Sequence, residues 1–126
     1  MQYRSALTRA RGLGSAKSGT SHWWMQRVSA VALVPLSFIV IHFINLSFEA
    51  NFQQITEWFA SPVNSTCMIA WILAVFYHAA LGLQVVIEDY VANEGRKIIF
   101  VWSTNLFFLF LALMALIAVF RIIFIG

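Results

Sequence analysis

Three long stretches of this sequence contain no Asp, Glu, Lys or Arg. They cover residues 28–48, 66–87 and 98–120, which are 21, 22 and 23 residues long. A helix that rises about 1.5 Å per residue needs roughly 20 residues to cross the hydrocarbon core of a bilayer. Because lipid offers the backbone no hydrogen-bond partner, a spanning segment must satisfy its own peptide groups as a helix. The stretches therefore predict an all-α membrane protein with three transmembrane helices.

The composition argues against a water-soluble fold. Of the 126 residues, 61% are hydrophobic and 10% are charged, and a soluble domain of this size has too little interior for so much apolar side chain. The length predicts one transmembrane anchor domain over 28–126, preceded by a basic interfacial arm over 1–27. The net charge of +3 comes largely from the arm, so it indicates orientation in a lipid membrane and not a nucleic-acid partner.

The basic residues are distributed unevenly about the predicted spans. The first loop contains Glu49 and Glu57 without any Lys or Arg, whereas the second contains Arg96 and Lys97. Positive residues stay on the inner side of a membrane, which predicts an inside N-terminus and an outside C-terminus. The arm shares its basic composition with transit peptides, but its glycines interrupt an amphipathic helix. We therefore expect a bacterial cytoplasmic (inner) membrane, with the mitochondrial inner membrane as the alternative. The basic residues before the first span are Arg4, Arg9, Arg11, Lys17 and Arg27.

A few strongly polar side chains lie within the predicted spans, where each is a candidate functional residue. His78 is near the middle of the second span, and Gly82, one turn later, leaves room for a flat macrocycle. An imidazole is a common axial ligand of haem iron. The alternative is a histidine that hydrogen-bonds a neighbouring helix, and His78 and Gly82 alone favour that alternative. His42 lies nearer the outer face, so we expect it to pack against a helix or serve a second site.

The inner ends of the first two spans carry a second group of candidates. Asp89 follows His78 by eleven residues, close to three helical turns, so both project from one side of a helix. Tyr90 is next to it, and a phenol there can donate a hydrogen bond to a quinone carbonyl while the carboxylate relays protons. Arg27 can pair with a haem propionate or orient a quinone carbonyl. The alternative is an ordinary interfacial belt of aromatic and charged side chains.

The segment from His78 to Tyr90, His-Ala-Ala-Leu-Gly-Leu-Gln-Val-Val-Ile-Glu-Asp-Tyr, carries a resemblance to a known family. Together with the basic arm, the three spans and the stretch from Ser18 to Arg27, it resembles the hydrophobic membrane-anchor subunit of succinate dehydrogenase (succinate:quinone oxidoreductase, complex II). The match is to the smaller, cytochrome b-type anchor, the D subunit. The resemblance implies half of a haem-binding helix bundle, shared with a second anchor subunit.

The resemblance also implies roles for individual residues. His78 would be one axial ligand of haem b, with the other supplied by the second anchor, and Gly82 and Arg27 would lie beside the haem. Tyr90 and Asp89 would bind ubiquinone and support its protonation. The chain would be a subunit of an enzyme without catalytic residues for succinate oxidation. FAD and the iron–sulfur clusters would belong to the flavoprotein and iron–sulfur partner subunits.

Three alternatives stand beside this interpretation. An anchor of the fumarate reductase type has the same architecture. A haem-free structural anchor or assembly factor would show no b-type haem spectrum. A small transporter, or its accessory subunit, would use His42 and His78 as proton carriers, but three unrepeated spans do not favour that class.

Overall fold

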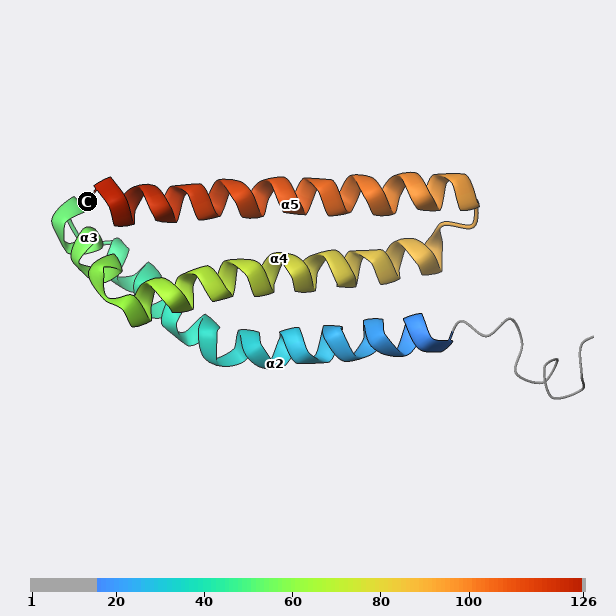
Figure 1. Ribbon diagram of the computed structural model, residues 1–126, viewed down its shortest axis with the longest axis horizontal. Helices are drawn as coiled ribbons and strands as arrows, with labels where there is room; N and C mark the ends of the chain where they lie inside the picture. Colours follow the sequence, from blue (N-terminus) through green and yellow to red (C-terminus); the bar gives the residue numbers. More distant parts are fainter. Residues whose placement is uncertain (1–15, 126) are drawn as a thin grey trace, which may run out of the picture.

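The computed structural model describes residues 16–125, and these residues form four helices. In chain order they are α2 (Ala16–Ser47), α3 (Phe52–Ala60), α4 (Pro62–Tyr90) and α5 (Glu94–Ile125). The described part of the chain contains no strand. The three long helices lie side by side and antiparallel, with α4 between α2 and α5 (Figure 1). We call the two ends of this layer the α3 end and the α4–α5 end.

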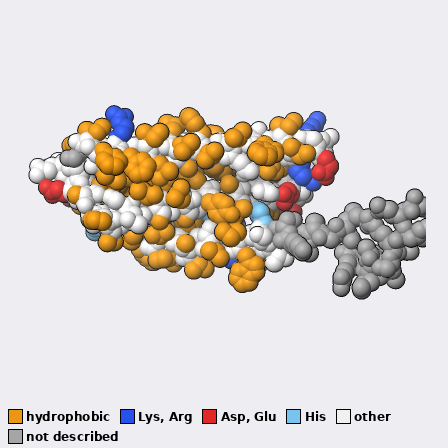
Figure 2. Space-filling view, in the orientation of Figure 1, with side chains coloured by type: hydrophobic (Ala, Val, Ile, Leu, Met, Phe, Trp, Pro, Cys, Tyr) orange, Lys and Arg blue, Asp and Glu red, His pale blue; other side chains and the backbone are white. Residues whose placement is uncertain are grey.

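The long helices confirm the prediction of three membrane spans. Each is long and apolar enough to cross a membrane. Helices α4 and α5 contain the second and third predicted windows, and α2 covers the first as far as Ser47. With 29 to 32 residues, they measure about 44–48 Å, which exceeds a hydrocarbon core of about 30 Å. Charged side chains lie toward the two ends of the visible face, and hydrophobic side chains cover much of the surface between them (Figure 2). The helix ends therefore extend beyond the lipid core.

The first helix begins before the predicted span. Residues 16–27 continue into it without a break, so the boundary predicted at residue 27 coincides with no change of structure. Residues 1–15 of the predicted basic arm lie outside the described residues. Pro35 lies inside α2, and the turquoise half of the helix turns away from the line of its blue half (Figure 1). A proline removes one backbone hydrogen bond and crowds the preceding turn, which accounts for the bend.

The first loop contains α3, a helix that the span prediction did not include. Asn51 and Gln54 form a reciprocal capping box: the Gln54 amide donates to Asn51 Oδ1 at 2.9 Å, and the Asn51 amide donates to Gln54 Oε1 at 3.0 Å. Trp58 and Phe59 are buried, whereas Phe52 is exposed. The buried pair joins α3 to the main hydrophobic cluster at the α3 end, which also contains Val40, Met68, Ile72 and Val119.

The second span begins and ends at defined residues. Ser61 caps α4 by accepting from the Asn64 amide at 3.5 Å, and Pro62 occupies the first helical position, as its fixed φ predicts. At the other end the Val91 amide donates to the carbonyl of Ile87 at 2.9 Å. One uninterrupted helix therefore carries both His78 and Tyr90. Their twelve-residue separation corresponds to about 18 Å along the axis.

Candidate functional site

His78 occupies the interior of α4, sixteen residues after Pro62 and twelve before Tyr90. Its side chain is half-buried. Nδ1 lies 3.0 Å from Oγ of Ser29 on α2, which is only 6% exposed. The hydrogen bond to a neighbouring helix, which was the alternative interpretation of this histidine, is thus observed at one ring nitrogen. Imidazole has a second nitrogen, so this bond leaves the ligand hypothesis open.

The other ring nitrogen of His78 has no such partner. The described residues offer no hydrogen bond to Nε2, and Nε2 is not among the buried polar atoms that lack a partner. A polar nitrogen in the middle of a membrane span is costly unless something satisfies it. Within the described residues, His78 therefore has one nitrogen with a hydrogen-bond partner and one nitrogen without.

Gly82 lies one turn beyond His78, opposite α2. A Cβ built on it would meet Nε2 of Gln26 at 3.5 Å, an ordinary van der Waals distance. The glycine therefore adjoins α2 at the level of Gln26, and the structure requires no glycine there for packing within this chain. Its predicted role in making room for a macrocycle stays a prediction.

A partly open cavity of about 400 Å³ lies between α2 and α4 toward the α4–α5 end. Two buried polar atoms of its lining residues, His22 Nε2 and Gln26 Oε1, have no hydrogen-bond partner in the described part of the chain. Buried polar atoms are normally paired, so these two indicate a missing polar partner. The lining residues are Gly19, His22, Trp23, Gln26, Arg27, Gln84, Val85 and Glu88.

Arg27 is an exposed residue on the wall of this α2–α4 cavity. Its guanidinium carbon lies 5.3 Å from the ring centroid of Trp23, a cation–π arrangement. In the described residues the salt bridge found is Lys97 with Glu94. Arg27 thus forms no ion pair there, although Glu88 lines the same cavity. Its guanidinium can therefore form an ion pair with an anionic group that enters the cavity.

Asp89 and Tyr90 end α4, and both side chains are exposed, Tyr90 by 84%. Tyr90 lines a second cavity of about 560 Å³ at the α4–α5 turn, together with Arg96 and Phe100. Arg27 lines the α2–α4 cavity instead, and Asp89 lines neither. The structure thus places Arg27, Asp89 and Tyr90 toward the α4–α5 end and His78 in the interior of α4, without bringing them into one closed site.

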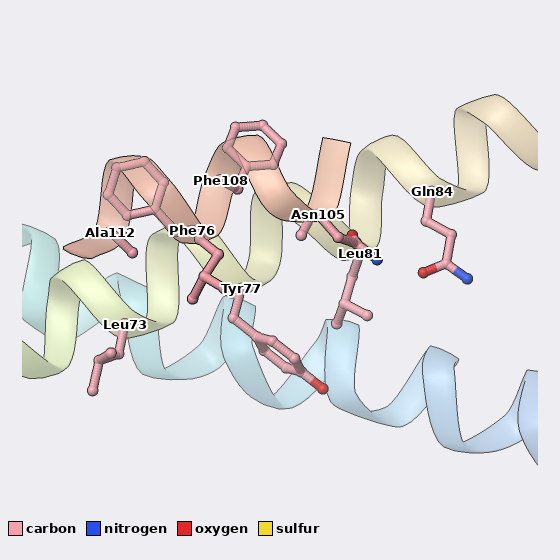
Figure 3. Close-up of a pocket in the computed structure, with 10 residues that line it drawn as sticks. Leu73, Phe76, Tyr77, Leu81, Gln84, Asn105, Phe108 and Ala112 are labelled. Atoms are coloured by element: carbon pink, nitrogen blue, oxygen red, sulfur yellow. The ribbon is translucent and has the colours of Figure 1, made fainter. Parts of the chain in front are cut away.

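A third cavity, of about 580 Å³, lies between α4 and α5 nearer the middle of the helices. It is mainly apolar, and Tyr77, Gln84 and Asn105 supply its polar groups. Tyr77, Leu81 and Gln84 project to the same side of α4 (Figure 3). Gln84 also lines the α2–α4 cavity, and it donates to Glu88 Oε1 at 2.9 Å. A line of polar side chains therefore runs along α4 toward the α4–α5 end.

Sequence reasoning missed two of the residues that the structure singles out. Ser29 was not a candidate, because a serine inside a span usually serves helix packing. Tyr77 was also overlooked, although it precedes His78 directly. His42 is exposed on α2, five residues before the helix ends. It lies at about 8 Å from the α3 end of its helix, whereas His78 lies about 24 Å from the corresponding end of α4.

The comparisons with known proteins all indicate the same family. The chain matches the family model described as succinate dehydrogenase/fumarate reductase transmembrane subunit over residues 1–123. The succinate dehydrogenase hydrophobic membrane anchor subunit of Rickettsia bellii is 31% identical over 118 residues, 94% of each chain. The subunit of the same name from Paracoccus denitrificans is 29% identical over 103 residues, 82% of this chain and 80% of that one.

Proposed function

Because this chain belongs to the family of succinate dehydrogenase/fumarate reductase transmembrane subunits and is a membrane anchor, we propose a specific role for it in succinate dehydrogenase. It tethers the flavoprotein and iron–sulfur subunits, shares haem b with a second anchor, and helps to form the ubiquinone-reduction site. One observation carries the haem proposal. His78 lies within a span, is bonded to α2 through Nδ1, and has no partner for Nε2 among the described residues.

The residues around His78 fit an axial haem ligand. A metal-ligating histidine needs one nitrogen free for the metal and commonly donates from the other to a fixed acceptor. Ser29 Oγ, 3.0 Å from Nδ1 of His78, is placed to be such an acceptor. His42 lies about 16 Å nearer the α3 end, so the two histidines within the predicted windows 28–48 and 66–87 do not share a level. With haem bound, the second ligand to its iron would come from the partner anchor. Bound haem b supplies a centre that takes up and releases one electron.

The α2–α4 cavity supports a place for the haem propionates. Arg27 contributes an unneutralised guanidinium, and His22 contributes a buried ring nitrogen without a partner. Both groups lie toward the α4–α5 end of the layer. The polar side chains along α4 lead to the same end. A carboxylate that enters the cavity gains a charge-assisted hydrogen bond from Arg27.

Tyr90 and Asp89 are proposed to serve the quinone. The α4 helix is longer than the hydrocarbon core, so its last residues reach the interface, where a quinone headgroup meets protons from water. The Tyr90 hydroxyl donates a hydrogen bond to a quinone carbonyl, and Asp89 delivers protons toward it. Both side chains are exposed in the isolated chain, so the rest of the pocket belongs to partner subunits.

The cysteine content of the chain indicates which cofactors other subunits must bind. A typical iron–sulfur cluster needs four cysteine ligands, and the sequence has one cysteine, Cys67. The FAD that would oxidise succinate and the clusters that would pass its electrons to the membrane would therefore be held by the flavoprotein and iron–sulfur partner subunits. We favour succinate oxidation over fumarate reduction because the relatives above are named as succinate dehydrogenase anchors.

Purification tests the proposal as a whole. We expect the wild-type complex, isolated through a tag on this subunit, to contain flavoprotein and iron–sulfur subunits and a second anchor. It should show reduced-minus-oxidised bands of b-type haem and reduce ubiquinone with succinate. A complex with all four subunits but no haem bands would replace the proposal with a haem-free anchor. Isolation of the chain without the soluble subunits would overturn the tethering role.

The orientation is part of the same proposal. The N-terminus and the α4–α5 end face the inside of a bacterial cytoplasmic membrane, because the basic residues gather there. The multi-pass helical structure and the bacterial relatives are consistent with that membrane. The α3 end then faces outside.

Thiol labelling measures the orientation directly. In a Cys67→Ser background, Gln53→Cys on α3 and Ala92→Cys in the α4–α5 turn introduce one exposed thiol each. We expect a membrane-impermeant maleimide to label Gln53→Cys in intact cells and to leave Ala92→Cys unlabelled. Both should react after the membranes are dissolved in detergent and denatured, which controls for thiol reactivity. Labelling of Ala92→Cys alone in intact cells would reverse the proposed topology.

A further inference from the structure

Ser29 makes two hydrogen-bond contacts through one hydroxyl group. Its Oγ lies 3.0 Å from the backbone carbonyl of Gln26 and 3.0 Å from Nδ1 of His78. A carbonyl oxygen can only accept, so the single hydroxyl hydrogen of Ser29 goes to Gln26. Toward His78 the same oxygen offers a lone pair. With that hydrogen directed to Gln26, the proton between Ser29 and His78 belongs to the imidazole.

This hydrogen-bond pattern assigns a tautomer to His78. With the proton on Nδ1 of a neutral ring, Nε2 carries the lone pair, which is the form that binds a metal ion. We propose that Ser29 is a positioning residue that holds His78 in this tautomer and ring orientation and so presents Nε2 to the haem iron. The inference rests on the proposed function, because it assigns a role to Ser29 only if His78 binds haem.

Burial makes the contact effective. Ser29 is 6% exposed, and the helix itself fixes its hydroxyl through the Gln26 carbonyl three residues earlier. Water has little access to replace the serine oxygen, so its removal leaves the Nδ1 proton without an acceptor. A hydrogen bond from Nδ1–H also increases electron donation by the ring to a metal on Nε2 and favours the oxidised ion. Ser29 therefore acts on the haem potential as well as on the geometry of the ligand.

Ser37 offers a matched comparison on the same helix. Its Oγ accepts a hydrogen bond from Nε1 of Trp71 at 3.0 Å, so it too joins α2 to α4. Trp71 cannot ligate a metal. Ser37→Ala therefore removes a similar interhelical bond without changing the tautomer of His78, and Ser29→Thr keeps a hydroxyl at the position of interest.

The experiment uses the purified complex with wild-type, Ser29→Ala, Ser29→Thr or Ser37→Ala anchor. Haem content, the midpoint potential from an optical titration and the electron paramagnetic resonance spectrum of the oxidised haem are measured. We expect Ser29→Ala to shift the reduction equilibrium toward the reduced haem by up to about fivefold, as expected for one lost hydrogen bond, and to alter the low-spin signals. Ser29→Thr and Ser37→Ala should keep the wild-type values.

Each outcome separates this inference from the function on which it rests. If Ser29→Ala retains both the potential and the spectrum of a haem that His78→Ala removes or shifts, the Ser29 inference is wrong and the proposed function stands. Equal changes in Ser29→Ala, Ser29→Thr and Ser37→Ala would show a general packing effect and would also overturn it. A wild-type complex without haem, or one whose haem is indifferent to His78→Ala, would remove the haem proposal itself.

Discussion

Replacement of His78 by alanine is expected to abolish or shift the b-type haem spectrum of the purified complex. The imidazole supplies one of two axial ligands in the proposed site, and methyl cannot coordinate iron. Haem is then lost, or it remains bound by the partner's ligand alone with a high-spin spectrum. Dithionite-reduced minus oxidised spectra, normalised to the iron–sulfur subunit, measure both results.

His42→Ala is the matched control for this prediction. His42 is the other histidine within a span, and its exposed position on α2 near the α3 end keeps it far from the level of His78. We expect His42→Ala to retain the wild-type haem content and band positions. If His42→Ala removes the haem while His78→Ala leaves it unchanged, His42 near the α3 end is the ligand. The proposed site at His78 is then wrong.

The three spans could be predicted from the sequence because a helix that crosses hydrocarbon needs about 20 consecutive residues without a charge. The sequence did not predict where the helices end. Hydrogen bonding in a helix continues into the interface, so α2 starts twelve residues before the predicted window, at Ala16. It also missed α3, which is short, amphipathic and outside the lipid core. The Asn51 and Gln54 pair that caps α3 was a usable signal for a helix start.

In the candidate site, the positions of residues along one helix could be predicted from the sequence, whereas contacts between two helices could not. The spacing from His78 to Tyr90 follows from one continuous helix, which the structure confirms. The contact between Ser29 and His78 depends on how α2 and α4 slide past each other, and 49 positions separate the two residues in sequence. The distribution of Arg27 and Tyr90 over different cavities has the same origin. The spacing of residues within one helix does not specify how two helices are aligned along their axes.

Removal of the Tyr90 hydroxyl is expected to slow quinone reduction while succinate oxidation continues. Tyr90→Phe keeps the ring and deletes the hydrogen-bond donor toward the quinone carbonyl, whose negative charge grows as electrons arrive. A hydrogen bond to a charged group is worth about 1.5–3 kcal/mol, which corresponds to a loss of about 10- to 100-fold in turnover. The measurement is succinate-dependent ubiquinone reduction, beside reduction of a water-soluble dye that takes electrons from the iron–sulfur subunit.

Tyr77→Phe separates a quinone role from a general effect of losing a phenol on α4. Tyr77 is also substantially exposed, at 44%, but it lines the α4–α5 cavity near mid-span, thirteen residues before Tyr90. At about 1.5 Å per residue this places it about 20 Å from the proposed quinone headgroup. Tyr77→Phe should therefore leave both activities unchanged. Equal loss of ubiquinone reduction in the two variants, or loss of dye reduction in Tyr90→Phe, would show that Tyr90 supports assembly and does not contact the quinone.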